Sequence, residues 1–323
     1  MGAREPVVGA ALNSGTVVVL GASGLLGQAL MQVLAQRGRS AIGLSRRQGV
    51  DLAALGSPQA LAALLDPYAP QLVINAAAAT DLEWCEEHPR AACDLHARLP
   101  GLLVTWAKSQ GVPWVQVSTD HYFCGSENRL HDECAPVMLV NQYARSKRAG
   151  ELLALTSPQA LVLRTNIVGR RGWPNKPSFA EWVVNSLRGG QPFAGYTDAW
   201  ASSMTAHQCA QGLLDLADRR ATGLLNLASC ESISKASFID ALAQAMALDA
   251  SAVRRQIRPA AAPSGVWRAN ALGLNVSRAQ ALLGRGLPTA AQVVAELAEA
   301  FKTDLQAPNR GQQSWPAKPR LLV

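Results

Sequence analysis

Tyr143 and Lys147 are the pair of side chains in this sequence best suited to proton chemistry. They stand four positions apart in the segment NQYARSK, and residues at that spacing share one face of a helix. A lysine ammonium near a phenol favours the phenolate and lowers the pKa of the tyrosine. We therefore predict that Tyr143 is a general acid that protonates a developing alkoxide at neutral pH.

Two hydroxyl residues, Ser118 and Thr119, precede this pair at the end of a short apolar segment, residues 114–118. A side chain at the carboxyl end of a parallel strand points into the ligand crevice of an α/β sheet. Either hydroxyl could then donate to a substrate carbonyl oxygen beside Tyr143. The alternative is a hydroxyl that only caps the end of the strand.

Three glycines, Gly21, Gly24 and Gly27, follow the apolar segment 16–20 and precede a helical pattern. In such a strand–turn–helix unit the first glycine permits the tight turn, the second lets the backbone approach a pyrophosphate, and the third allows close helix packing. The helix N-terminus then offers N–H groups to the phosphates. We expect the cofactor here, with the neighbouring turn residues Ser23, Leu25 and Leu26 beside it; the alternative is a tight turn without a ligand.

The nature of the dinucleotide is indicated by Ser45, Arg46 and Arg47, which follow the second apolar segment, residues 41–44. A protein that binds NAD usually places an acidic residue here to accept from the ribose 2′-hydroxyl. An arginine instead donates pairs of hydrogen bonds to a 2′-phosphate. The sequence therefore favours NADPH over NADH, the alternative being arginines that are merely exposed near a turn.

Alternating strands and helices must position these residues. Strands are expected at residues 16–20, 41–44, 71–75, 114–118 and 160–165, with helices from about 25 to 37, at 91–109 and at 141–155. This order predicts parallel strands with right-handed crossovers, an α/β, Rossmann-type doubly wound sheet. Later helices at 179–187, 205–218, 235–246, 277–283 and 289–302, with a strand at 223–227, predict a smaller, mostly helical C-terminal substrate-binding cap.

The expected domain organisation follows from this change from alternating strands and helices to mostly helices. Residues 1–15 form an N-terminal extension, 16–168 the NADP-binding domain, 169–305 mainly the substrate-binding cap, and 306–323 a loose tail. Segments near 198–228 are expected to pack back on the first domain.

Composition excludes several classes of protein. The 323 residues are 49% hydrophobic, and the charge of +7 is carried by scattered pairs such as Arg46-Arg47, with few aromatic residues. We therefore expect no nucleic-acid partner. The six cysteines form no CxxC pair, which argues against a metal site, and no uncharged apolar run reaches membrane-spanning length. We expect a cytoplasmic protein without a membrane partner.

Several ordered motifs resemble the extended short-chain dehydrogenase/reductases, and within them the dTDP-4-dehydrorhamnose reductase group. GASGLLG, VINAAAATDLEWCE, STDHYFCG, NQYARSK and LRTNIVG stand where that group has its glycine turn, fourth strand and loop, STDYVFDG, NxYGxSK and LRTSWVYG. The match runs from about residue 16 to 169.

The resemblance implies roles for particular residues. Thr119, Tyr143 and Lys147 match the catalytic triad, with Ser118 beside it. Residues implied to contact the cofactor are Asp51 and Leu52 near the adenine, Asn75, Ala76, Ala77 and Ala78 after the next strand, and Thr165 and Asn166 near the nicotinamide.

The departures from the group's motifs fall mainly at positions that face the substrate. His121 stands where the group has tyrosine, with Tyr122 one place later, and Ile167 replaces a tryptophan. His96 replaces an asparagine, and Ala79 and Ala144 also differ. The candidate substrate-binding residues are His121, Tyr122, Ile167, Arg170 and Trp200, and a substrate diphosphate is expected near Arg170, Arg171 or Lys176.

The main hypothesis is an NADPH-dependent reductase of a nucleotide-linked 4-keto-deoxysugar, which is a small-molecule partner. One alternative keeps this machinery for a different natural-product carbonyl or for an epimerase. The other is a non-catalytic NADP-binding subunit like the methionine adenosyltransferase β-subunit. A homodimer is also possible.

Overall fold

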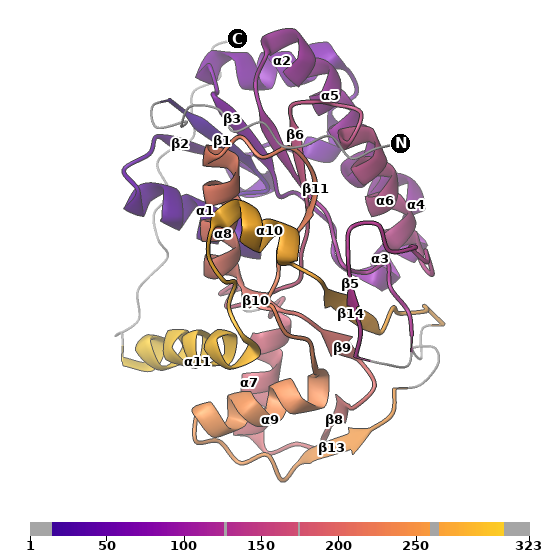
Figure 1. Cartoon of the computed structure of the whole chain (residues 1–323), viewed down its shortest axis with the longest axis vertical. Coiled ribbons are helices and arrows are strands. Elements are labelled where there is room, and N and C mark those ends of the chain that lie inside the picture. The colour runs from indigo at the N-terminus through magenta and orange to yellow at the C-terminus, as the bar shows by residue number, and fades with distance from the viewer. Residues whose placement is uncertain (1–14, 126–127, 174, 259–264, 307–323) are drawn as a thin grey trace.

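The computed structural model describes residues 15–125, 128–173, 175–258 and 265–306 of the chain, so most of the expected extension (1–15) and tail (306–323) lies outside them. Its centre is a six-stranded parallel sheet in the order β11-β6-β4-β3-β1-β2 (Figure 1). The predicted doubly wound α/β sheet is confirmed. Its strands are β1 (Val17–Leu20), β2 (Ala41–Leu44), β3 (Leu72–Asn75), β4 (Trp114–Val117), β6 (Ala160–Arg164) and β11 (Gly223–Asn226).

Helices cover both faces of this sheet. Val17 and Val19 of β1 pack with α1 (Leu25–Gln36) and α8 (Ala206–Asp218) on one face. Val18 and Leu20 pack on the other face with α2 (Pro58–Leu65), α5 (Leu99–Gln110) and the end of α6 (Gln142–Ala154). Successive strand residues point to opposite faces, so a strand buried on both sides must be apolar throughout, as residues 17–20 are.

The helix expected at residues 91–109 is divided in the structure. It consists of α4 (Pro89–Cys93), a π-helical turn (Asp94–Arg98) and α5. A π-helical turn shifts a backbone carbonyl out of the regular hydrogen-bond pattern of an α-helix. The carbonyl of His96, in this turn, packs directly against Gly150 of α6, where a Cβ would lie 1.8 Å from the carbonyl oxygen. This contact brings α6, which carries Tyr143, against the helix that follows β3. The helices α2 and α3 (Leu82–Glu87) were not predicted.

The cap contains short strands beside its helices. Its helices are α7 (Phe179–Gly189), α9 (Lys235–Ala245) and α11 (Ala290–Gln306). Between them lie β8 (Phe193–Tyr196), paired with β13 (Val253–Gln256), and a small sheet of β5 (Leu130–His131), β9 (Trp200–Ala201), β12 (Ile233–Ser234) and β14 (Ala271–Leu274). A third pair, β7 (Ile167–Val168) and β10 (Met204–Thr205), joins the two halves. Strands of two residues carry no sequence period, so they could not be predicted.

Part of the C-terminal half belongs to the layers of the central sheet. β11 extends the sheet beside β6, α8 packs against α1, and α10 (Ser277–Leu283) packs against α8. Arg37 at the end of α1 forms ion pairs with Asp215 and Asp218 of α8. The cap is therefore joined to the first half through packed helices as well as through the chain.

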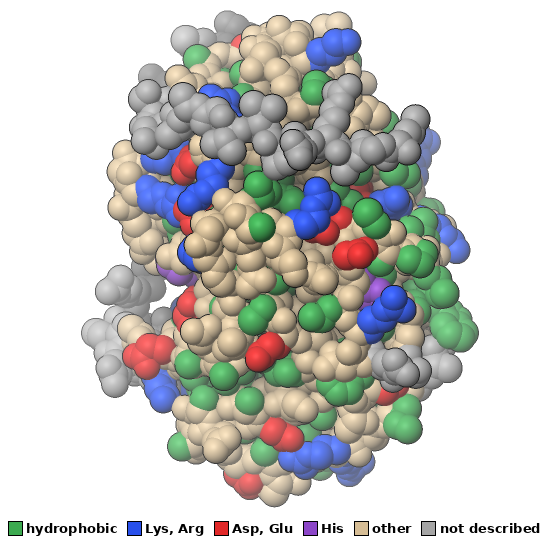
Figure 2. All heavy atoms as spheres, in the orientation of Figure 1, with side chains coloured by type: hydrophobic (Ala, Val, Ile, Leu, Met, Phe, Trp, Pro, Cys, Tyr) green, Lys and Arg blue, Asp and Glu red, His purple; other side chains and the backbone are tan. Residues whose placement is uncertain are grey.

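The charged side chains on the face in Figure 2 are dispersed, with acidic groups among the basic ones. In the part of the chain that the structure describes, no helix has the length and apolar character needed to cross a bilayer.

Candidate active site

The expected functional segments all follow the carboxyl ends of parallel strands. The glycine turn follows β1, Asn75 ends β3, Ser118 and Thr119 follow β4, and Thr165 follows β6. Because these strands are parallel and adjacent, their ends meet along one edge of the sheet. This edge is where open α/β sheets hold their ligands.

The glycine turn is shaped so that only glycine fits at two of its positions. Gly21 has a φ of +80°, and a Cβ there would lie 2.7 Å from the backbone of Ala77; at Gly27 it would lie 2.2 Å from the Gly21 oxygen. The helix α1 begins at Leu25, and its N-cap residue, Gly24, has no side chain that could bond to the first helix amides. The first turn of α1 also contains no acidic residue. The turn thus offers unobstructed backbone and a helix N-terminus suited to a pyrophosphate.

The expected adenosine-side residues divide into structural and exposed groups. Ser45 is buried, and its hydroxyl accepts from the Arg47 amide. Asp51 caps a turn by accepting from the Ala53 amide at 3.1 Å, and Leu52 is buried. Arg46 and Arg47 remain exposed beyond β2. The acceptor that would meet a ribose 2′-hydroxyl is therefore lacking at the end of β2, where two guanidinium groups stand instead.

Asn75 shapes the loop after β3 instead of pointing into solvent. Its side chain donates to Gln116 Oε1 at 2.9 Å and accepts from the Ala77 amide at 3.3 Å. Ala77 is the residue that faces Gly21, so this loop and the glycine turn form adjoining walls. Ala76 and Ala78 complete the short backbone segment that the sequence assigned to the cofactor.

Tyr143 and Lys147 lie on the first two turns of α6, and both are buried. The helix begins at Gln142 because the side chain of Asn141 accepts from the Ala144 amide at 2.8 Å. The Thr119 hydroxyl lies close enough to Tyr143 to lower its pKa, while it donates to Asp120 Oδ1 at 3.4 Å and accepts from the His121 amide at 3.2 Å. The structure thus brings together Thr119, Tyr143 and Lys147, the three residues of the expected triad.

The charge states of this pair differ from the expectation. Burial raises the pKa of Tyr143 above its usual value, the Thr119 hydrogen bond opposes this, and Asp120 and Cys85 raise the pKa further. The Lys147 ammonium, expected to lower the Tyr143 pKa, donates instead to the Val117 carbonyl at 2.7 Å. Burial lowers the pKa of Lys147 to about 8, partly offset by Glu151. Tyr143 is therefore held in the protonated form that a proton donor requires.

Ser118 does not share the catalytic position with Thr119. Its hydroxyl donates to Glu151 Oε2 at 2.6 Å and lies 3.1 Å from the hydroxyl of Tyr122. Glu151 is fully buried and forms an ion pair with Arg164 at 2.7 Å. Tyr122 is also fully buried, which removes it from the substrate-facing position expected of it. Ser118 and Tyr122 thus stabilise the interior, and Thr119 is the hydroxyl that faces Tyr143.

His96 fills a positioning role that the sequence did not reveal. Its Nε2 accepts from the Ala79 amide at 2.9 Å, and its Nδ1 lies 2.8 Å from Ser146 Oγ. The ring meets that of Tyr143 edge-on, with centroids 5.6 Å apart. Burial first, and then Lys147, hold the pKa of His96 well below its usual value. The neutral imidazole therefore links the loop after β3 to the catalytic helix.

Asp120 and His121 lie beside Tyr143. The Asp120 carboxylate accepts from Asn166 Nδ2 at 2.5 Å, and burial raises its pKa to about 7. The His121 ring lies edge-on to Tyr143 with centroids 5.5 Å apart. Its Nδ1 is buried without a hydrogen-bond partner in the described residues. Burial, followed by Lys235, Arg268 and Arg258, lowers the pKa of His121 to about 4, so its imidazole is neutral.

Three cations of the cap, Lys235, Arg258 and Arg268, surround this position and were missed by the sequence analysis. Lys235 begins α9, and its ammonium lies 5.3 Å from the Phe179 ring centroid. Arg258 donates to the Arg268 and Ala269 carbonyls and leaves a buried Nε without a partner in the described residues. They come from separate segments far from the catalytic motifs, so no local pattern could reveal them.

The remaining predicted residues lie around this site with different roles. Asn166 also accepts from Ser203 at 2.6 Å, and Thr165 is buried 3.5 Å from the Cys209 sulfur. Ile167 and Trp200 are half-buried in β7 and β9. Arg170 is exposed.

The residues expected to meet a substrate diphosphate are placed elsewhere. The Arg171 guanidinium lies against Trp173, and Lys176 forms an ion pair with Asp81 at 3.9 Å. Trp173 also meets the guanidinium of Arg47, and Asp81 caps α3 after β3.

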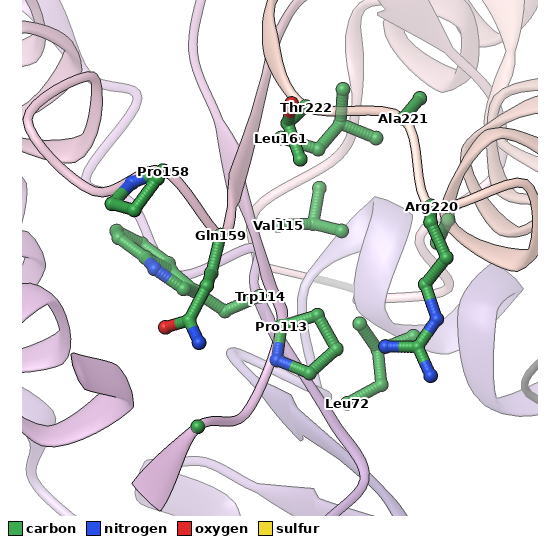
Figure 3. A pocket seen from close by; sticks show the side chains of 12 residues that line it. Leu72, Pro113, Trp114, Val115, Pro158, Gln159, Leu161, Arg220, Ala221 and Thr222 are labelled. Atoms are coloured by element: carbon green, nitrogen blue, oxygen red, sulfur yellow. The ribbon is translucent and has the colours of Figure 1, made fainter. Parts of the chain in front are cut away.

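A separate cavity of about 190 Å³ lies at the opposite end of the sheet (Figure 3). It is lined by apolar side chains such as Leu72 and Trp114, and Arg220 is its one titratable lining residue. It therefore offers no proton chemistry. In the described ranges there is also no group of three or more acidic, histidine or cysteine side chains that could hold a metal.

Comparisons with known proteins agree with this geometry. A family profile described as "RmlD substrate binding domain" matches residues 15–303. The "Probable low-salt glycan biosynthesis reductase Agl14" of Haloferax volcanii is 29% identical over 300 residues, covering 88% of this chain and 97% of that protein. A dTDP-4-dehydrorhamnose reductase of Burkholderia thailandensis is 30% identical over 237 residues, covering 70% and 76%.

A solved structure extends the comparison to three dimensions. The dTDP-4-dehydrorhamnose reductase of Bacillus anthracis, crystallised in complex with NADP, has a TM-score of 0.78 and 17% identity. The similarity covers 88% of this chain and 97% of that chain, and it shows a shared fold.

Proposed function

We propose, from the premise that this chain belongs to the RmlD substrate-binding-domain family of NAD(P)-dependent oxidoreductases, that it is an NADPH-dependent reductase of a nucleotide-linked 4-keto-deoxysugar. The observation that carries this proposal is the meeting of Thr119, Tyr143 and Lys147 beside the glycine turn. The names of its relatives, a glycan biosynthesis reductase and a dTDP-4-dehydrorhamnose reductase, point to the same substrate class.

The proposed chemistry divides between the cofactor and the protein. A nicotinamide cofactor held at the glycine turn would supply the hydride that the ketone carbon accepts. Tyr143 donates its phenolic proton to the carbonyl oxygen as negative charge develops there, and Thr119 orients that oxygen by hydrogen bonding. Lys147, whose ammonium donates to the Val117 carbonyl, is proposed to hold the ribose of the cofactor.

The preference for NADPH rests on the end of β2. Ser45 is occupied in a turn, Asp51 caps the next turn, and Arg47 carries the charge that a 2′-phosphate requires. The Bacillus anthracis relative was crystallised with NADP, which agrees with this choice.

The anionic part of the substrate is proposed to lie at Lys235, Arg258 and Arg268. Each of these cations lowers the pKa of His121, and Arg268 also forms an ion pair with Glu83. Burial lowers the pKa of Lys235, and its ammonium forms no ion pair with a carboxylate in the described residues, so a diphosphate would relieve an unfavourable charge. A diphosphate held there places the attached sugar near His121 and Tyr143.

The test is turnover by a Tyr143→Phe variant. We expect its kcat for reduction of a dTDP-4-keto-deoxysugar, followed by NADPH oxidation, to fall by about 10²–10⁴-fold, because the proton donor is lost. The dissociation constant for NADPH should change little. Normal turnover by this variant would contradict the assignment of the acid, and absence of turnover by the wild type with every nucleotide-sugar would contradict the substrate class.

A second candidate is the reduction of a different natural-product ketone. The unpartnered nitrogen of His121 beside Tyr143 favours it, because the sugar reductases that this sequence resembles have tyrosine at that place. Turnover by wild-type enzyme with ketones that lack a nucleotide, and none with nucleotide-sugars, would support this candidate.

A further inference from the structure

The described parts of the loop that follows β7, residues 170–173 and 175–176, are here named the cap loop and contact segments beside the glycine turn and after β3. Gln28 of α1 donates both to the Ser23 carbonyl of the glycine turn, at 2.9 Å, and to the Arg171 carbonyl, at 3.2 Å. Lys176 pairs with Asp81 after β3. The cap loop is thus fastened to two segments that border the dinucleotide site.

The backbone of the cap loop is also held from the cap side. Glu181 of α7 accepts from the amides of Gly172 and Ser178, each at 2.7 Å. These backbone bonds keep the pKa of Glu181 below its usual value although burial opposes them. Glu181 is therefore a fixed anchor, and the side chains of Arg171 and Trp173 project from a constrained backbone.

Arg47 and Arg171 converge on the indole of Trp173. The guanidinium carbon of Arg47 lies 4.5 Å from the ring centroid, and that of Arg171 lies 5.2 Å from it. Within the described ranges neither guanidinium forms an ion pair with a carboxylate, and the Glu181 carboxylate acts on the Arg171 charge without contacting it as an ion pair. Two cations gathered at one ring repel each other, so this arrangement is favourable when an anion lies between or beside them.

Arg171 Nη1 donates to the Lys176 carbonyl at 3.4 Å, but two other donors at this place lack an acceptor. Arg171 Nε and Trp173 Nε1 are buried and have no hydrogen-bond partner in the described residues. Guanidinium and indole nitrogens can donate but cannot accept. A buried donor without an acceptor is costly. A group with several acceptor oxygens and negative charge, such as a phosphate, would satisfy these donors together.

We infer that Arg171 and Trp173 of the cap loop complete, with Arg47, the binding site for the 2′-phosphate of the dinucleotide. Arg47 comes from the end of β2, where that phosphate is expected, and the cap loop supplies the second guanidinium and the indole N–H. This inference rests on the proposed function. It makes the cap loop a determinant of cofactor choice, a role that the sequence analysis did not give it.

The experiment measures dissociation constants for NADPH and NADH by titration calorimetry on the full chain. Arg171→Gln should weaken NADPH binding by about ten- to a hundredfold, the effect of a charge-assisted bond to a phosphate. Trp173→Phe keeps an aromatic ring, removes one N–H, and should weaken NADPH binding by about fivefold. NADH binding should change less than about twofold in both variants, which also shows that they are folded.

Two additional arms separate the possible outcomes. Arg188→Gln, on the exposed end of α7, is the matched control and should change neither constant. Binding of 2′,5′-ADP should fall in Arg171→Gln by the same factor as NADPH binding, whereas binding of 5′-AMP should not fall.

The inference is overturned if the variants keep the wild-type ratio of the NADPH and NADH dissociation constants. It is also overturned if the variants change only the binding of inorganic phosphate. A wild type that binds NADH as tightly as NADPH overturns it while the reductase proposal stands. A wild type that binds neither dinucleotide contradicts the proposed function itself.

Discussion

Replacement of Gly21 by alanine should damage this protein in two separable ways. The φ of +80° at this residue costs about 1–2 kcal/mol for a residue with a Cβ. The new Cβ would also lie 2.7 Å from the N and Cα of Ala77, which are backbone atoms that cannot rotate away. Forcing an extra methyl into such packing costs about 1–3 kcal/mol more. We expect a loss of about 2–5 kcal/mol in the free energy of unfolding.

A matched control isolates the contact from the backbone strain. Gly38 has a φ of +65° at the end of α1, and a Cβ there would meet nothing within 4 Å. Gly38→Ala should therefore lose about 1–2 kcal/mol and leave NADPH affinity unchanged. Gly21→Ala should lose affinity by tenfold or more, on the order of 1.4 kcal/mol, because relief of the overlap displaces Ala77 or the glycine turn.

The assay combines urea unfolding with calorimetric titration of NADPH for the wild type and both variants. The two stabilities and the two affinities are then compared in the same buffer. If Gly21→Ala matches Gly38→Ala in both measurements, the argument that the glycine turn and the loop after β3 form adjoining walls of one site is wrong.

Two further predictions concern the triad strand. Thr119→Val should lower kcat by about 10²–10³-fold with little loss of stability. Ser118→Ala should chiefly lower the stability of the fold, because it removes a buried donor to Glu151. Equal effects of the two variants on kcat would contradict the assignment of Thr119. Because the pKa of Asp120 is raised to about 7, the folded protein retains a proton between pH 4 and 7 that the unfolded chain releases, so this carboxyl makes stability fall as pH rises through that window. The pKa of His121, lowered to about 4, acts with the opposite sign between pH 4 and 6.5. Asp120→Asn should therefore make stability rise more steeply with pH in urea unfolding at pH 5 and 6.5, and an unchanged slope would refute this account.

The cofactor half of the site was predictable because its signals are local in sequence. The glycine turn and the Tyr143–Lys147 spacing each lie within one strand–turn–helix unit or one helix, where short-range geometry determines which atoms meet. The same reasoning could not choose between Ser118 and Thr119. That choice depends on Glu151 of α6, which accepts from the Ser118 hydroxyl and from Arg164, and both partners lie in elements beyond the strand itself.

The substrate half was not predictable for a topological reason. Lys235, Arg258 and Arg268 reach His121 from the start of α9 and from the segments on either side of residues 259–264. Their meeting depends on the packing of the cap, which includes two-residue strands that have no sequence period. Arg171 and Lys176 carry the expected charge, yet the same packing places them against Trp173 and Asp81.

The expectation for the Tyr143 pKa failed because residue spacing gives proximity but not burial. Burial disfavours charge on every group at the centre of the site, so the pKa values of Tyr143 and Asp120 are raised and those of Lys147, His96 and His121 are lowered. Fixed positive charge lies instead at the rim, on Lys235, Arg258 and Arg268 toward the cap and on Arg47 and Arg171 toward the cofactor. In the proposed reaction the charged phosphates of substrate and cofactor would occupy that rim, while the ketone meets a protonated phenol in surroundings of low dielectric, where a hydrogen bond to a developing oxyanion is strongest.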